Sequence, residues 1–317
     1  MFSSFFLKKI TLSFLLLSSL LTNAVEKTNQ ILLKSAFKHL EEQNKNWNVK
    51  ECLKYSFFED KDKKGLTLII NGDSFVNPDS LSILPVDLLT IQYTGIKTLD
   101  FLDSGRLSTN LNFLILANNV DLKNYNGLKN SSIRILRIVG APGFIDASVV
   151  GKNVANLQII NTGIRSLKLT TPQQILHLEL LVNRNLKDKT QINKMSNLLS
   201  LIADDISGID FSTLKKLRYF ELKKSNITDF PALPQKNISI TIYSCFNLNS
   251  IKNLKGKSVN KMILKTMKGQ LKKFVDVLLS MNISELTILS DDFTYYPELE
   301  KIKGLKKLTF NEKVMAF

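Results

Sequence analysis

A short apolar pattern recurs along most of this chain at a nearly constant interval, and it constrains the fold more than any other feature. Each copy has three apolar residues spaced by three and then two positions, followed three residues later by a small or polar residue. Two clear copies are Val154, Leu157, Ile159 and Thr162, and Leu217, Phe220, Leu222 and Ser225. The third apolar residue of each copy serves as an anchor, and the anchors are Ile70, Ile91, Leu116, Ile138, Ile159, Leu180, Leu201, Leu222, Ile242, Leu264, Ile288 and Phe310. Their spacing of 20 to 25 residues indicates a repeat architecture.

The spacing within each copy indicates a short strand. Residues two apart on a strand face the same side, so the second and third apolar residues both point inward. Strands that recur in the same sense must be parallel, and the residues between them must carry the chain back along an outer face. One repeat cannot bury its inward face alone, but stacked repeats bury it against each other. The sequence therefore predicts an α/β solenoid with a parallel sheet on one side and turns or short helices on the other.

This pattern resembles the leucine-rich repeat superfamily, and its period is similar to that of the short-repeat, internalin-like class. The resemblance covers about 245 of the 317 residues. It implies a curved parallel sheet on the concave face of about 12 repeats in residues 65–317. The family usually has Asn three residues after the anchor, where its amide bonds to the turn backbone. Because Ala141 and Met267 cannot make such bonds, we expect local irregularity near residues 140 and 267.

The first 24 residues have the features of a secretory signal peptide. Lys8 and Lys9 precede an apolar run at residues 10–21, and small residues lie before a cleavage site after Ala24. Twelve apolar residues cover about 18 Å, which is short of the roughly 30 Å hydrocarbon core of a membrane. We therefore expect a secreted chain with no membrane span after signal cleavage.

Residues 25–64 do not fit the repeat and are expected to form an N-terminal helical cap. Leu33, Ala36 and Leu40 have helical spacing, and an apolar segment follows at residues 47–58. A solenoid's first repeat would otherwise expose its core. Helical spacing also predicts an amphipathic helix within residues 270–281, and the 25-residue interval predicts an insertion on the convex side at residues 100–110.

The residues needed for catalysis are scarce. The two histidines are separated by many repeats, and Cys52 and Cys245 would lie about 38 Å apart on the expected sheet, too far to bridge. The adjacent aspartates at 204–205 and 291–292 diverge on turns, and no glycine-rich phosphate loop or metal-ligand motif occurs. We expect a protein that is not an enzyme and has no cofactor or metal.

The charge of +15 does not indicate nucleic-acid binding. The basic residues are 37 Lys and only 6 Arg. Proteins that recognise phosphates favour the bidentate guanidinium of Arg, so a Lys-rich balance accompanied by 29 Asn is more typical of an AT-rich genome.

The concave face is the expected site of protein binding. The residues directly after the anchors face outward and are all apolar from Ala117 to Ile202. The expected contact residues are Ala117, Val139, Ile160, Leu181 and Ile202, with Phe113, Arg137, Glu179, Tyr219 and Tyr243 around them. An aliphatic surface bordered by Tyr and Arg suits a protein partner outside the cell that made the chain, whether or not that partner belongs to a host. The alternative is that a tail or a second copy covers this face.

A second expected surface is basic. Residues 252–273 contain eight lysines and no acidic residue. One interpretation is that this segment binds anionic glycans or cell surfaces through Lys257, Lys261, Lys265, Lys268 and Lys272. The simpler interpretation is a solvated, lysine-rich face. Binding through these lysines would weaken with salt, whereas an apolar concave contact would not.

Overall fold

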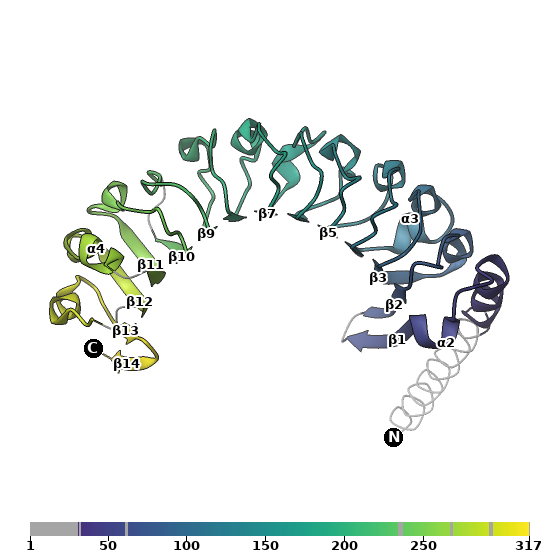
Figure 1. The fold of residues 1–317 in the computed structure, drawn as a ribbon, viewed down its shortest axis with the longest axis horizontal. Coiled ribbons are helices and arrows are strands. Elements are labelled where there is room, and N and C mark those ends of the chain that lie inside the picture. The colour runs from purple at the N-terminus through teal and green to yellow at the C-terminus, as the bar shows by residue number, and fades with distance from the viewer. Residues whose placement is uncertain are drawn as a thin grey trace, which may run out of the picture.

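The computed structural model describes residues 31, 33–60, 63–233, 237–266, 269–291 and 294–316. The expected signal peptide, Met267 and Lys268 lie outside these residues. The described chain forms one sheet of 14 strands in which each strand pairs with its neighbours in sequence. The sheet lines the inner side of an arc, and most of the helices, including α3 and α4, lie on its outer side (Figure 1).

The strands are β1 (Leu53–Asp60), β2 (Lys63–Asn71), β3 (Val86–Gln92), β4 (Phe113–Ala117), β5 (Ile135–Val139), β6 (Asn156–Ile160), β7 (His177–Leu181), β8 (Ser200–Ala203), β9 (Tyr219–Lys223), β10 (Ile238–Tyr243), β11 (Ser258–Thr266), β12 (Asn282–Ser290), β13 (Lys307–Phe310) and β14 (Lys313–Ala316). All neighbouring pairs from β2 to β13 are parallel. The pairs at the two ends, β1 with β2 and β13 with β14, are antiparallel hairpins.

Short helices fill the outer side of the arc, as the repeat pattern predicted. The α-helices with defined bounds are α2 (Val49–Cys52), α3 (Leu107–Asn110) and α4 (Gln270–Leu279). The 3₁₀ helices are η1 (Asp79–Ile83), η2 (Asp100–Asp103), η3 (Asn126–Leu128), η4 (Ala147–Val149), η5 (Pro172–Gln174), η6 (Thr190–Lys194), η7 (Phe211–Thr213), η8 (Lys252–Leu254) and η9 (Pro297–Lys301). The expected helix within residues 270–281 is confirmed by α4, and the expected insertion at residues 100–110 contains η2 and α3.

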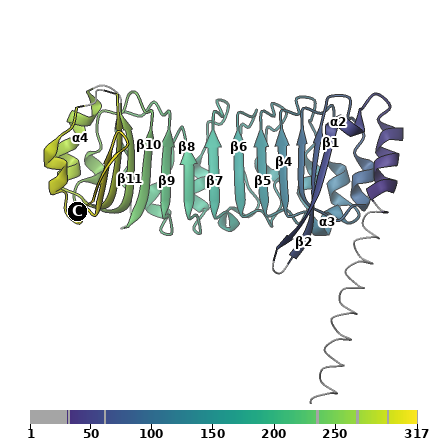
Figure 2. The ribbon, with the colours of Figure 1, turned by 90° about the horizontal axis from the view of Figure 1, so that it is seen from below.

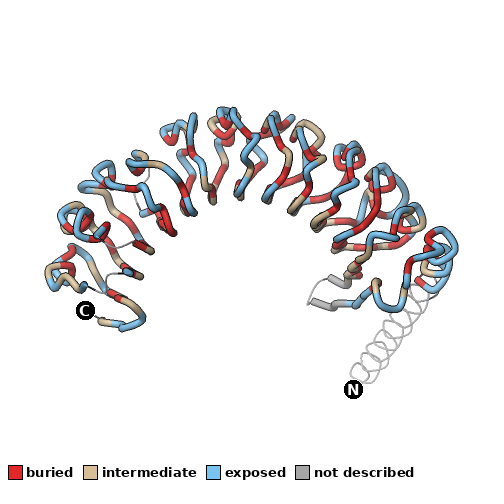
Figure 3. Tube along the Cα trace, viewed as in Figure 1, coloured by how far each residue is buried: buried red, intermediate tan, exposed pale blue. Residues whose placement is uncertain are grey.

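The anchor residues build the core of the sheet. Ile70 pairs with Ile91, and the same alignment continues through Leu116, Ile138 and Ile159 to Leu180. Each of these anchors is at most 2% exposed. Buried and half-buried residues alternate along most of the parallel strands (Figure 3). Because successive side chains of a strand point to opposite faces, the anchors face the interior while their neighbours face the concave side. The predicted long, mostly parallel sheet is therefore confirmed, and its arrangement is consistent with a repeat solenoid.

One anchor assignment is wrong. Leu201 pairs with Leu178, whereas Ala203 pairs with Leu180 and Leu222. The anchor of β8 is therefore Ala203, which is fully buried. Alanine is smaller than the other anchor side chains, so the pattern of larger apolar residues places the anchor of the seventh repeat two residues too early.

The turns that leave the strands share a left-handed residue. Positive φ angles occur two residues after the anchor at Tyr93, Asn118, Gly140, Asn161, Val182, Lys224 and Ser244. Gly140 keeps this conformation although Ala141 follows it, so the irregularity expected near residue 140 is not found there. Asn119 does make the bonds expected of its position, because its side chain accepts from the Thr94 N–H and donates to the Ile91 carbonyl.

The first described elements pack at one end of the sheet. Residues 33–43 are helical and bury Leu33, Ala36 and Leu40, which confirms the predicted helical spacing. Trp47 packs on Phe75 at 4.7 Å between ring centroids and donates its indole N–H to the Asn71 carbonyl. The β1–β2 hairpin follows and projects beyond the edges of the other strands (Figure 2). No helix in the described part of the chain is long and apolar enough to cross a membrane.

Candidate binding surfaces

An apolar patch lies on the concave side of β4–β8. Ala117, Val139, Ile160 and Leu181 pair in register on four successive strands and are half-buried. Phe113, Ile115 and Ile135 lie at the β4–β5 end of the same face. At about 4.8 Å per strand, the row from Ala117 to Leu181 extends about 14 Å. These seven residues together with Ile202 form the surface that we call the concave apolar patch.

Ile202 lies in the patch but not in the row predicted for it. It pairs with Glu179 on one side and Glu221 on the other, so it belongs to the central row of outward residues. The row of Leu181 continues instead through Asp204, which follows the true anchor Ala203. The expected unbroken apolar column therefore ends at Leu181, one strand earlier than predicted.

The expected polar border is present on the same face. Arg137 is exposed on β5 and Glu179 is half-buried on β7, both in the central row. Tyr219 donates a hydrogen bond to Glu221, which also pairs with Lys223 at 3.2 Å. Burial, reinforced by the Glu221 hydrogen bond, raises the pKa of Tyr219 to about 12. Polar side chains therefore follow the apolar patch toward the C-terminal half of the sheet.

Tyr243 and Lys265 extend this polar border over β10 and β11. The Lys265 Nζ lies 4.7 Å from the centre of the Tyr243 ring and donates to its hydroxyl at 3.3 Å. A cation over an aromatic face is attracted by the ring quadrupole. The two side chains therefore hold each other in place on the concave surface.

The basic segment is divided between the inner and outer sides of the arc. Lys261 and Lys265 lie on the concave side of β11, whereas Lys272 is exposed on α4, on the outer side of the arc (Figure 1). Lys257 lies in the turn that enters β11, and Lys268 lies outside the described residues. The structure therefore does not bring the described lysines of this segment together on one surface.

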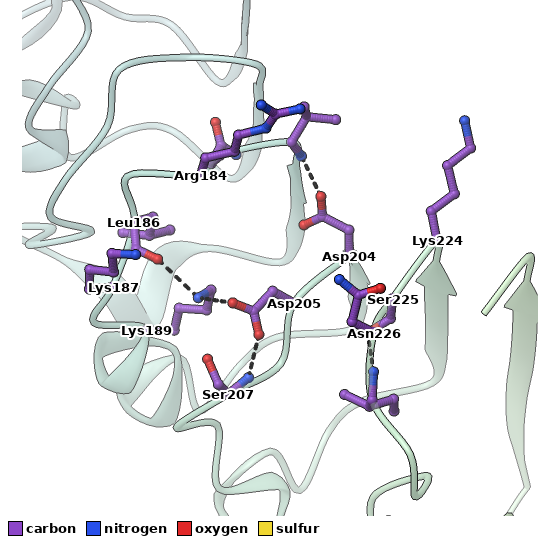
Figure 4. Close-up of a pocket in the computed structure, with 13 residues that line it drawn as sticks. Arg184, Leu186, Lys187, Lys189, Asp204, Asp205, Ser207, Lys224, Ser225 and Asn226 are labelled. Carbon is purple, nitrogen blue, oxygen red and sulfur yellow. Dashed lines mark hydrogen bonds and ion pairs between the residues drawn. The ribbon is translucent and has the colours of Figure 1, made fainter. Parts of the chain in front are cut away.

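A pocket of about 730 Å³ opens among the turns that follow β7, β8 and β9. Its lining residues are Val182, Asn183, Arg184, Leu186, Lys187, Lys189, Asp204, Asp205, Ser207, Lys224, Ser225, Asn226 and Ile227. Four of these side chains are cationic and two are carboxylates. Figure 4 shows the cationic and acidic residues arranged around the opening, and we call this site the rim pocket.

Lys189 and Asp205 form an ion pair in the rim pocket. The Lys189 side chain is 5% exposed, and its Nζ donates to Asp205 at 2.7 Å and to the Leu186 carbonyl at 3.0 Å. Partial burial acts to raise the pKa of Asp205, but hydrogen bonds from Lys189 and Ser207 outweigh it and lower that pKa. The Asp205 carboxyl is therefore ionised at neutral pH.

The described residues include no cluster of three or more His, Cys, Asp or Glu side chains that could hold a metal ion. Cys52 and Cys245 are both free thiols, as their predicted separation requires. Cys245 is 2% exposed, and burial raises its pKa. This thiol is therefore a poor nucleophile in the folded chain.

The rim pocket was missed by the sequence reasoning, although a signal for it exists. The residue that precedes a 3₁₀ helix is Leu99 before η2, Tyr125 before η3 and Ile251 before η8, and all three are buried. The equivalent residue before η6 is Lys189, which is equally buried. A lysine in a position that three other repeats fill with a buried apolar residue could have indicated a polar site.

No protein-family model matches this sequence, and no curated protein matches it. The function must therefore be argued from the surfaces themselves.

Proposed function

We propose that this chain is a non-catalytic recognition protein that binds a protein partner through the concave apolar patch. Its fold is that of a leucine-rich repeat solenoid of the short-repeat, internalin-like class. The chain is exported after cleavage of residues 1–24 and meets its partner outside the cell. Residues 25–64 cap the first repeat, and the β13–β14 hairpin closes the last.

The observation that supports this proposal is the in-register row of Ala117, Val139, Ile160 and Leu181. Fixed by backbone pairing on four parallel strands, these side chains present a contiguous apolar surface that is half open to solvent. Soluble chains rarely leave such patches uncovered unless a partner uses them. The rigid sheet also lowers the entropy lost on binding, because its side chains are already positioned.

The polar residues around the patch suit the border of a protein interface. Arg137, Tyr219 and Tyr243 are of the types enriched at such interfaces, and they lie beside the apolar centre. Tyr219 and Tyr243 are also held by hydrogen bonds to neighbouring side chains. A partner with an apolar centre and polar edges would fit this arrangement.

The proposal is tested by placing charges in the centre of the patch. Ile160→Glu with Leu181→Lys puts two charges on the concave face, where they remain in contact with water. The fold should remain intact, and capture of partners from extracellular fractions should fall at least about tenfold, because losing a central anchor typically costs about 2 kcal/mol. Capture is compared at low and physiological salt by quantitative mass spectrometry.

A matched control separates the patch from a general effect of surface charge. Val120→Lys with Ile145→Glu makes the same kinds of change at residues that are 61% and 51% exposed in turns outside the sheet. This control should capture the same partners as the unaltered chain. Equal capture by the patch variant would place recognition elsewhere, and a strong loss of binding with rising salt would favour a basic surface instead.

A further inference from the structure

The rim pocket exists because the turn after β8 differs from its neighbours. The turns after β7 and β9 project through left-handed residues, Val182 and Lys224. The corresponding residue after β8 is Asp205, which is not left-handed. Seven residues separate the anchor Ala203 from η7, compared with nine between Leu180 and η6. The shorter segment leaves a hollow between the two flanking turns (Figure 4).

The acidic side chains of the rim pocket are already engaged within the chain. The Asp204 carboxylate accepts from the Val182 backbone N–H. The Asp205 carboxylate accepts from Lys189 and from the Ser207 backbone N–H. These contacts satisfy one oxygen of Asp204 and both oxygens of Asp205, which makes the pocket a poor site for a cation.

The cationic side chains at the opening are not engaged in this way. Arg184, Lys187 and Lys224 are exposed, and none of them makes an ion pair with another described residue. Lys189 uses two of its three N–H donors in the contacts given above. The lining therefore has a net charge of +2 and retains more free donors than free charged acceptors.

We propose that the rim pocket binds an oxyanion, the sulfate, phosphate or carboxylate group of a small polar molecule. Arg184, Lys187 and Lys224 attract the anionic group, and the third donor of Lys189 contributes from the pocket floor. The exposed Asn226 side chain offers an amide group to the polar remainder of the ligand. A volume of about 730 Å³ lies within the usual range for small-ligand sites.

The buried lysine supports a role in binding rather than in stability. Burying an ammonium group costs free energy even when it is paired, and an apolar residue would fill the same position at no such cost. Leu99, Tyr125 and Ile251 show that the equivalent repeat positions accept apolar side chains. Lys189 therefore provides a charge in a repeat whose turns open a pocket beside it.

The experiment measures binding of four probes to the mature chain by isothermal titration calorimetry at fixed ionic strength. The probes are inorganic sulfate, inorganic phosphate, glucuronate and a heparin-derived disaccharide, which distinguish the possible carriers of the oxyanion. Arg184→Glu with Lys224→Glu should weaken binding at least about tenfold, because each removes a charge-assisted contact and adds a repulsive charge. The backbone amides of Asn183, Ser225 and Asn226 should shift during an NMR titration with the tightest probe.

The control is Arg165→Glu with Lys168→Glu, which makes the same substitutions at exposed residues outside the rim pocket. It should change the affinity by less than about twofold. If the paired pocket variant does not fold, Lys224→Glu is compared with Lys168→Glu in the same way. The proposal is overturned if none of the probes binds or if pocket and control variants lose affinity equally, which would indicate a diffuse attraction to a basic protein.

Discussion

Leu180 and Leu181 offer a sharp test of the register of the sheet. They are adjacent on β7, but Leu180 is 2% exposed and faces the core, whereas Leu181 is half-buried on the concave side. Replacing either by alanine makes the same chemical change in the same strand. Any difference in the free energy of unfolding therefore reports which side chain faces inward.

The structure sets the expected size of the two effects. A buried Leu→Ala substitution costs about 2 to 5 kcal/mol, depending on how well the neighbours fill the cavity. The inward neighbours of Leu180 are Ile159 and Ala203, and alanine is too short to fill the space. We therefore expect Leu180→Ala to cost about 4 kcal/mol, in the upper half of that range. Leu181→Ala leaves no cavity and should cost less than about 1 kcal/mol.

Urea unfolding followed by far-ultraviolet circular dichroism at 25 °C measures both values. The slope of the free energy against urea should be similar in the two variants, so that the change in midpoint reports stability. Equal costs, or a larger cost for Leu181→Ala, would refute the inward orientation of Leu180 and the alternation on which the concave apolar patch depends.

Three further outcomes follow from the structure. Thiol titration at pH 8 should label Cys52 in the folded chain but leave Cys245 protected until unfolding, because burial raises the pKa of Cys245. Rapid labelling of a folded Cys52→Ser variant, which retains only Cys245, would contradict this. Asp205→Asn should lower the melting temperature at pH 7. The pKa of Asp205 is lowered in the folded state, so its contribution to stability is present above the unfolded-state pKa of about 4 and is lost as the pH falls through the folded-state pKa. A difference in melting temperature that persisted unchanged to pH 2 would exclude the Lys189 pair as its cause. N-terminal sequencing of the exported chain should begin at Val25, and a product beginning at Met1 would overturn the proposed export.

The repeat made the main features of the sheet predictable. Inward anchors such as Ile91 and Ile159 are large and apolar, so their spacing identifies both the strands and the buried face. The antiparallel strands β1 and β14 were not predicted, since hairpins at the ends of a solenoid have no copy elsewhere in the chain with which to compare them. The partner of the concave face also stays a prediction, because an apolar surface shows where binding is favourable without naming what binds.

The seventh repeat, which contains β8, differs from its sequence-based prediction, and the physical cause of this difference also explains the rim pocket. Ala203 is too small to be recognised as an anchor, and the two aspartates after it replace the left-handed turn found in neighbouring repeats. The altered turn opens the pocket, and Lys189 brings a charge into it from a position that holds a buried apolar residue in three other repeats. Local departures that cost stability without an evident structural gain are expected at functional sites. A variant that restores the apolar residue should therefore separate a role of Lys189 in stability from a role in oxyanion binding. Lys189→Leu, made together with Asp205→Asn so that no charge is left unpaired, should fold at least as stably as the unaltered chain. If it does so and still binds every oxyanion with unchanged affinity, the charge at Lys189 has no part in binding.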